Sequence, residues 1–189
     1  MPANSAKQVL RIIGGTWRSR KIQFPQNAAL RPTPDRVRET LFNWLMPVIE
    51  GARCLDLFAG SGVLGLEALS RGASEAVFVD SHRPSIEALR DTCKMLDAQH
   101  VGFFHGDALQ YLNGTPTRFD IVFLDPPYRS PLLAQSAILL QRHGWLANDA
   151  YVYVEHAQDF DVTTLPHGWQ LHRQKQAGQV CFSLYSVAN

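Results

Sequence analysis

Residues 53–65 read RCLDLFAGSGVLG, and this stretch decides the fold. Its first six residues are largely apolar, which is typical of a buried strand. Gly60, Gly62 and Gly65 follow at once, and glycines permit both a tight turn and a close approach of the backbone to a ligand. The residues after this loop have a helical pattern, and the free N–H groups at such a helix start bind anions. The stretch therefore predicts a strand, loop and helix unit of a ligand-binding α/β fold.

Apolar runs and helical patterns alternate along the chain after this unit. We expect strands at 53–58, 76–80, 101–105, 119–125 and 151–156, with helices at 62–71, 84–96, 108–112 and 131–141. This alternation predicts a doubly wound α/β sheet with right-handed crossovers. The last residues, 170–176 and 179–187, have the pattern of an antiparallel hairpin that turns at Ala177-Gly178.

The first 50 residues form a different kind of segment. Residues 9–14 and 20–24 have the pattern of two short strands around Gly14-Gly15, and a helix with one apolar stripe begins at Pro34. We therefore expect an N-terminal hairpin and helix extension over residues 1–50, followed by one α/β domain over residues 51–189.

Charge is distributed unevenly between these two parts. Residues 1–38 carry eight basic residues and one acidic residue, whereas the rest of the chain carries 10 basic and 16 acidic residues. A basic arm of this kind binds polyanions, because each neutralised phosphate releases counterions. The alternative interpretation is that these residues form an ordinary solvated surface with scattered charge. The excess of basic residues in 1–38 favours nucleic acid as the partner.

The remaining composition excludes several classes of protein. The three cysteines, Cys54, Cys93 and Cys181, form no CxxC pair, so we expect neither a disulfide framework nor a metal site. The first residues lack the apolar core of a signal peptide, and no stretch approaches the roughly 20 apolar residues that span a membrane. We expect a cytoplasmic protein without a membrane segment, acting as a monomer.

The acidic residues around the glycine loop indicate which ligand it binds. Glycine spacing alone is also compatible with NAD. Asp56, however, lies directly before the loop, where a carboxylate would repel a pyrophosphate and would suit an ammonium group. S-adenosylmethionine carries an amino group and a sulfonium, so it fits this loop better. Asp80 ends the next strand and is expected to bind ribose hydroxyls, and Asp107 either contacts the adenine or caps the following helix.

The sequence Asp125-Pro126-Pro127-Tyr128 follows the most apolar strand. Prolines lack an N–H group, so the carbonyls here project rigidly and form, with the Asp125 carboxylate, a corner of acceptors. Acceptors for the hydrogens of a base amino group direct its lone pair at a methyl carbon and stabilise the developing positive charge. Asp125 would orient the amine or also accept its proton, and Tyr128 would stack on the base. The corner predicts methylation of an exocyclic base nitrogen.

Together, these motifs resemble a known family. DLFAGSGVLG, Asp80 and DPPY look like class I S-adenosylmethionine-dependent amino-methyltransferases, and the stretches RIIGGTWRSR (11–20) and RPTPDRVRETLFNWL (31–45) look like the 16S ribosomal RNA guanine-N2 methyltransferase family. The resemblance implies a Rossmann-like, seven-stranded, mostly parallel sheet with helices on both faces. It implies S-adenosylmethionine as donor, S-adenosylhomocysteine as product, and one guanine of 16S rRNA in a small-subunit assembly intermediate as substrate.

The resemblance also implies roles for individual residues. The donor would be held by Asp56, Phe58, Gly60, Ser61, Gly62, Asp80, Asp107 and Ala108. The target amine would be held by Asp125, Pro126, Pro127 and Tyr128. The RNA would be gripped by Arg11, Arg18, Arg20, Lys21, Arg31, Arg36 and Arg38.

Three alternatives remain beside this interpretation. A DNA adenine-N6 methyltransferase shares DPPY, but such enzymes usually carry a recognition insertion for which this chain has no room. A protein glutamine methyltransferase more often has asparagine at the corner. A non-catalytic RNA-binding assembly factor would not need the acidic and DPPY positions that this chain retains.

Overall fold

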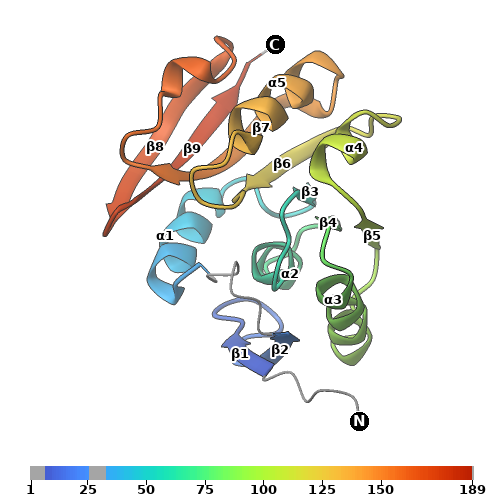
Figure 1. The fold of residues 1–189 in the computed structure, drawn as a ribbon. Helices are drawn as coiled ribbons and strands as arrows, with labels where there is room; N and C mark the ends of the chain where they lie inside the picture. The colour runs from blue at the N-terminus through green and yellow to red at the C-terminus, as the bar shows by residue number, and fades with distance from the viewer. Residues whose placement is uncertain (1–6, 26–32, 189) are drawn as a thin grey trace.

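The computed structural model describes residues 7–25 and 33–188. Its centre is a seven-stranded sheet of order β5-β4-β3-β6-β7-β9-β8 (Figure 1), and within the described sheet β9 alone runs opposite to the other strands. The strands are β3 (Arg53–Asp56), β4 (Glu75–Asp80), β5 (Val101–His105), β6 (Phe119–Leu124), β7 (Leu146–Ala157), β8 (Trp169–Ala177) and β9 (Val180–Val187). The expected Rossmann-like, mostly parallel α/β sheet is confirmed.

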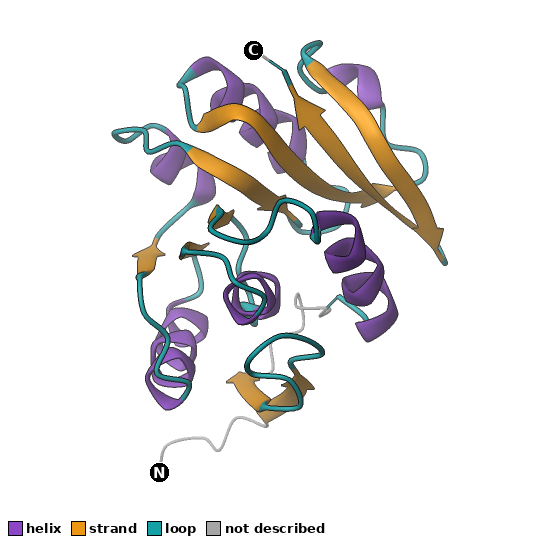
Figure 2. Ribbon diagram, turned by 180° about the vertical axis from the view of Figure 1, so that it is seen from behind, coloured by secondary structure: helices purple, strands orange, loops and turns teal. Residues whose placement is uncertain are grey.

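Helices cover both faces of the sheet, as Figure 2 shows from behind. One face packs against α1 (Asp35–Leu45), α2 (Val63–Ser70) and α3 (Arg83–Met95), and the other packs against α4 (Ala108–Leu112) and α5 (Leu132–Arg142). A short 3-10 helix, η1 (Val162–Thr164), connects β7 to β8. Each face has its own apolar cluster, so the parallel strands between them are buried on both sides, as such strands require.

The N-terminal hairpin forms a separate two-stranded sheet of β1 (Lys7–Arg11) and β2 (Lys21–Pro25). It lies beneath α2 in Figure 1, at the end of the molecule opposite the C-terminus. Ile12 and Ile22 are almost fully buried in the same apolar cluster as Leu66 of α2 and Leu89 of α3. The hairpin is therefore anchored to the body by apolar burial.

A glycine permits this close contact. Gly15 has a φ of +75°, and a Cβ placed there would lie 1.7 Å from the Ser70 carbonyl oxygen at the end of α2. Thr16 N–H donates to that same carbonyl at 2.7 Å, and the Ser70 hydroxyl donates to the Gly14 carbonyl. A side chain at position 15 would force the hairpin away from the helix.

Strand β7 is longer than its sequence pattern predicts. We expected it to start at residue 151, but it begins at Leu146. The pairing with β6 shifts between Phe119 and Ile121, and Asp149 has a φ of +58°. This bulge interrupts the alternation of apolar and polar residues, which conceals the first part of the strand.

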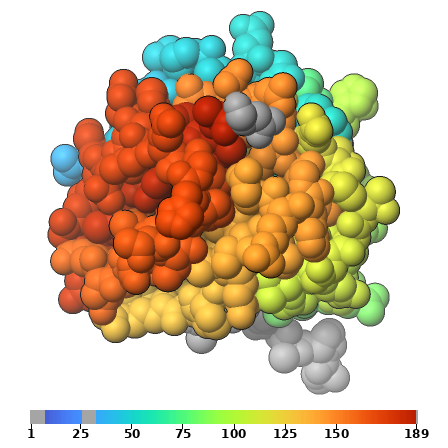
Figure 3. Space-filling view, turned by 90° about the horizontal axis from the view of Figure 1, so that it is seen from above, coloured from blue at the N-terminus to red at the C-terminus, as the bar shows by residue number. Residues whose placement is uncertain are grey.

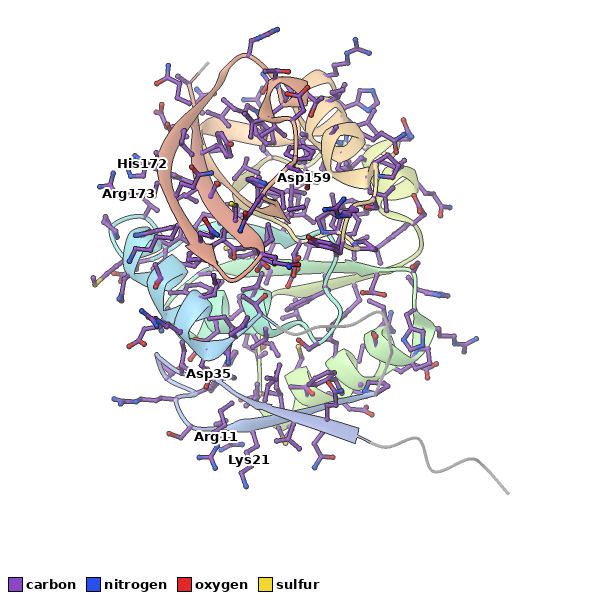
Figure 4. All side chains as sticks on the ribbon, turned by 60° about the vertical axis from the view of Figure 1, so that its left-hand side comes forward. Arg11, Lys21, Asp35, Asp159, His172 and Arg173 are labelled. Atoms are coloured by element: carbon purple, nitrogen blue, oxygen red, sulfur yellow. The ribbon has the colours of Figure 1, made fainter. Side chains whose placement is uncertain are left out.

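The two edge strands of the sheet are β5 and β8, and the residues of β8 after Trp169 are exposed. His172 and Arg173 project outward from this strand in Figure 4, and basic side chains of this kind discourage pairing with another edge. Seen from above in Figure 3, the C-terminal hairpin lies beside α5, where Trp169 Nε1 donates to Gln141 Oε1 at 3.0 Å. This contact ties the edge strand β8 to α5, which packs on one face of the sheet.

Candidate active site

A cleft of about 1270 Å³ opens at the carboxyl ends of the parallel strands. Open α/β sheets bind ligands at this edge, because the loops after adjacent strands diverge there. The cleft is lined by residues that follow β3, β4, β5, β6 and β7, and by Thr33 from the N-terminal extension. Of the predicted donor-binding residues, Asp56, Phe58, Gly60, Ser61, Asp80, Asp107 and Ala108 line the cleft, whereas Gly62 lies outside its lining.

The glycine loop owes its shape to two left-handed residues. Gly60 has a φ of +52° and Gly62 a φ of +72°. A Cβ at Gly62 would also lie 2.0 Å from Leu89 Cδ2, so this glycine allows α2 to pack on α3 rather than touching the cleft. Gly60 N–H donates to Asp80 Oδ2 at 2.7 Å, which ties the loop to the end of β4.

Asp80 holds its position through both carboxylate oxygens. Oδ2 accepts from Gly60, and Oδ1 accepts from the His82 N–H at 2.7 Å. The carboxylate is thus oriented before any ligand arrives, and each oxygen keeps a second lone pair for a hydroxyl group. This geometry fits the predicted ribose contact.

Asp56 is buried, with 2% of its surface exposed, and accepts a hydrogen bond from Gly65 N–H at 3.1 Å. Burial, together with the negative charge of Asp80, raises the pKa of Asp56 to about 7. A cation beside it would offset this penalty. The carboxylates of Asp56 and Asp80 therefore fit the ammonium group of S-adenosylmethionine and would disfavour a pyrophosphate.

Asp107 caps a helix. Its Oδ1 accepts from the N–H groups of Leu109 at 2.8 Å and Gln110 at 3.4 Å, at the start of α4. The cap was one of the two predicted roles. Because Asp107 also lines the cleft beside Ala108, the contact to adenine stays a prediction.

The DPPY corner follows β6 and lies within the cleft. Burial, together with the negative charges of Glu155 and Asp56, raises the pKa of Asp125 well above its ordinary value. A carboxyl group in this setting gains from any ligand that donates hydrogen bonds to it.

Tyr128 presents its ring to solvent, with 55% of its surface exposed. The guanidinium of Arg129 lies 5.5 Å from the ring centroid and pairs with Asp159 at 3.0 Å. This ion pair connects the DPPY loop to the loop after β7, and Figure 4 labels Asp159 there. An exposed, oriented ring at the mouth of a cleft is suited to stacking on a base.

Three site residues escaped prediction from the sequence. Glu155 Oε1 accepts from the hydroxyls of Thr33 at 3.0 Å and Tyr153 at 2.7 Å. Glu155 and Thr33 line the cleft, and they are 122 residues apart in the chain. The available signal was the position of Glu155 at the end of a strand beside the strand that ends in Asp125.

The predicted RNA-binding residues divide into three groups. Arg11, Arg18, Arg20, Lys21 and Arg36 are exposed, and Arg11 and Lys21 point away from the body in Figure 4. Arg31 lies outside the described residues.

Arg38 requires a correction, because its side chain is fully buried and pairs with Glu67 at 2.9 Å. It also pairs with Asp35 and donates to the Thr33 carbonyl. Since the hydrogen-bonding capacity of its guanidinium is used inside the protein, Arg38 cannot grip RNA in this conformation.

None of the helices in residues 7–25 and 33–188 is long and apolar enough to cross a bilayer. The same part of the chain contains no cluster of three or more histidine, cysteine or acidic residues arranged to hold a metal ion.

The protein has a Rossmann-like sheet with an acidic glycine loop and a DPPY corner at one edge. This combination of fold and site places it in the class of methyltransferases. Residues 10–186 match the family model described as Conserved hypothetical protein 95, so the chain belongs to this family. That membership and the relatives described next together confirm the family resemblance carried by the sequence motifs.

Individual relatives cover almost the whole chain. The chain is 48% identical over 184 residues to the Escherichia coli K12 protein named Ribosomal RNA small subunit methyltransferase D, covering 97% of this chain and 93% of that protein. It is 41% identical to the Haemophilus influenzae protein of the same name, over 96% and 95% of the two chains. A solved Escherichia coli structure described as a putative methyltransferase, yhhF, superposes with a TM-score of 0.91 at 46% identity, over 96% and 99% of the chains.

Proposed function

We propose that this protein transfers a methyl group from S-adenosylmethionine to the exocyclic N2 of one guanine in 16S rRNA during assembly of the small ribosomal subunit. The target in this proposal is the guanine at position 966 of 16S rRNA. The observation that carries the proposal is the DPPY corner, which shares one cleft with the acidic glycine loop. The names of the relatives support rRNA as the substrate.

The donor side of the cleft is assigned by charge. Asp56 would face the ammonium group, Asp80 the ribose hydroxyls, and Asp107 with Ala108 the adenine. Phe58, Gly60 and Ser61 would line the path between them. When bound, S-adenosylmethionine supplies a methyl group that is already activated by its sulfonium, so the protein has only to position and stabilise.

The acceptor side performs that positioning. The Asp125 carboxylate and the proline carbonyls would accept the hydrogens of the guanine amine, which frees the nitrogen lone pair for attack on the methyl carbon. As the C–N bond forms, the C–S bond breaks and S-adenosylhomocysteine leaves with that electron pair. One N–H proton is then released to Asp125 or to water. Tyr128 would hold the base by stacking.

The N-terminal extension of residues 1–50 would grip the RNA. Its exposed basic residues, Arg11, Arg18, Arg20, Lys21 and Arg36, are available for phosphates, and the extension sends Thr33 into the cleft. The extension would thus contribute both cations for the RNA and one residue of the cleft, and the chain acts as a cytoplasmic monomer in this proposal.

The test is methyl transfer from labelled S-adenosylmethionine to small-subunit precursors from cells that lack this protein. We expect one methyl per particle, recovered as N2-methylguanosine by mass mapping of digested 16S rRNA. Label in DNA or protein but not in rRNA would overturn the assignment, as would N6-methyladenosine in the digest.

A further inference from the structure

Two neighbouring parallel strands, β6 and β7, carry carboxylates at the same level of the cleft. In the pairing of β6 with β7, Leu124 lies opposite Val154, so Asp125, which directly follows β6, lies beside Glu155, which is still within β7. Adjacent strands are about 4.8 Å apart, and residues in register point to the same face. Both residues line the cleft. Asp125 belongs to the DPPY corner, whereas Glu155 has no role in the function proposed so far.

Glu155 is held rigidly by two hydroxyl groups. Thr33 donates to Glu155 Oε1 at 3.0 Å, and Tyr153 donates to the same oxygen at 2.7 Å. Thr33 is 3% exposed and Tyr153 is fully buried, so both donors are themselves fixed by packing. Within residues 7–25 and 33–188, no hydrogen bond to Oε2 is found, and this oxygen is therefore the one left for a ligand.

This arrangement is costly without a ligand. Burial raises the pKa of Glu155, and the hydrogen bonds from Tyr153 and Thr33 only partly oppose the rise. The charge of Glu155 in turn contributes to the raised pKa of Asp125. A ligand with adjacent hydrogen-bond donors would relieve both carboxylates at once.

We propose that Glu155 accepts the ring N1–H of the target guanine while the Asp125 corner accepts the hydrogens of its N2 amine, so that Glu155 selects guanine over adenine. The proposal rests on guanine N2 being the methylated atom. Guanine presents N1–H and N2–H as neighbouring donors, which matches two carboxylates side by side. Adenine presents a lone pair at N1, which would face the Glu155 carboxylate unfavourably. With adenine in the cleft, Glu155 Oε2 would be left without a hydrogen-bond donor.

The test compares two bases at the target position. Small-subunit particles are reconstituted with 16S rRNA that carries either guanine or 2-aminopurine there. 2-Aminopurine keeps the exocyclic amine but has a lone pair at N1 in place of N1–H. We expect the unmodified protein to methylate guanine with a kcat/KM at least about 10-fold above that for 2-aminopurine.

The decisive variant is Glu155→Gln. Its amide oxygen still accepts from Thr33 and Tyr153, so its NH2 group takes the place of Oε2 and donates to the base. We expect kcat/KM for guanine to fall by about 10-fold to 100-fold, while the value for 2-aminopurine holds or rises. The matched control, Asp149→Asn, makes the same change at an exposed residue of the same strand, outside the cleft, and should leave both values unchanged.

Two outcomes would overturn the proposal. One is an unchanged preference for guanine in the Glu155→Gln protein, whether kcat/KM falls equally for both bases or does not fall. This result would leave Glu155 a structural role only. The other needs no variant: equal rates on the two bases by the unmodified protein. If the unmodified protein instead methylates no guanine at all, the proposed function fails together with this proposal. Melting temperatures of each variant check that the fold is retained.

Discussion

Arg38 Nη1 donates to Glu67 Oε1 at 2.9 Å, and both side chains are fully buried. The same Glu67 oxygen accepts from the Ile13 N–H of the hairpin, and Arg38 also donates to the Arg11 carbonyl. Its Nε donates to the carbonyl of Thr33, the residue whose hydroxyl also holds Glu155. One buried ion pair thus connects the basic hairpin, helix α2 and the wall of the active site.

Replacing Arg38 with Ala should destabilise the fold strongly. The change leaves Glu67 buried with a single cationic partner, Arg71, and breaking a buried pair in this way costs about 3–5 kcal/mol. Urea unfolding monitored by tryptophan fluorescence measures the loss. The control Arg36→Ala removes an exposed arginine of the same helix and should change stability by less than about 0.5 kcal/mol. Equal stability of the two variants would contradict the structural role of Arg38.

The sequence contained a signal for the burial of Arg38 that its charge concealed. Arg38 lies three residues before Leu41 and seven before Leu45, so it belongs to the apolar stripe of α1. Counting it with the basic arm gave the wrong prediction, because charge alone does not distinguish a solvated arginine from one that meets a buried carboxylate. The partner, Glu67, lies within an apolar helix, and only the fold brings the two together.

The fold itself was predictable because local patterns determine it. Strands β3, β4 and β6 are apolar runs that end at or directly before Asp56, Asp80 and Asp125. Because the strands are parallel, these ends lie at one edge of the sheet. Glu155 could not be assigned in the same way. Its role depends on the register of β6 against β7 and on Thr33, which is distant in the chain. Neither of these contacts leaves a local pattern.

Asp125→Ala should abolish most of the methyl transfer while leaving donor binding intact. Removing one preorganised acceptor of a developing positive charge typically lowers kcat by about 100-fold to 1000-fold. Steady-state methylation of small-subunit precursors measures kcat and KM, and calorimetry measures the affinity for S-adenosylmethionine. A variant that raised KM and kept kcat would show that Asp125 contributes to binding alone.

Asp56 should make the stability of the ligand-free protein depend on pH. Burial raises its pKa from 3.8 to about 7, so between these values the folded protein keeps a proton that the unfolded chain has released. The contribution of this residue is therefore fully present at low pH and is lost as the pH rises towards 7, by about 1.4 kcal/mol per pH unit. Urea unfolding at several pH values, compared with Asp56→Asn, isolates the effect. A constant difference between the two proteins across this range would contradict it.

The salt dependence of RNA binding should reveal the basic arm. Arg18, Arg20 and Lys21 are exposed, and Ala at all three positions should weaken binding and lower the slope of log K against log salt by about 2–3. Filter binding of a 16S rRNA fragment between low and moderate salt measures this slope. Arg142→Ala, an exposed arginine at the far end of α5, is the control and should leave the slope unchanged. An unaltered slope in the triple variant would show that these hairpin residues do not contact the RNA and that the hairpin has a structural role only.

Tyr128 should act through its ring rather than its hydroxyl. The side chain is 55% exposed at the mouth of the cleft, where the Arg129 guanidinium lies 5.5 Å from its ring centroid, and a stacked base is worth about 1–3 kcal/mol. Tyr128→Phe keeps the ring and should retain most of the activity, whereas Tyr128→Ala should lower kcat/KM by about 10-fold to 100-fold. Because so exposed a side chain contributes little to packing, the melting temperatures of both variants should match that of the unmodified protein. Equal loss of activity in Phe and Ala would instead assign the role to the hydroxyl group.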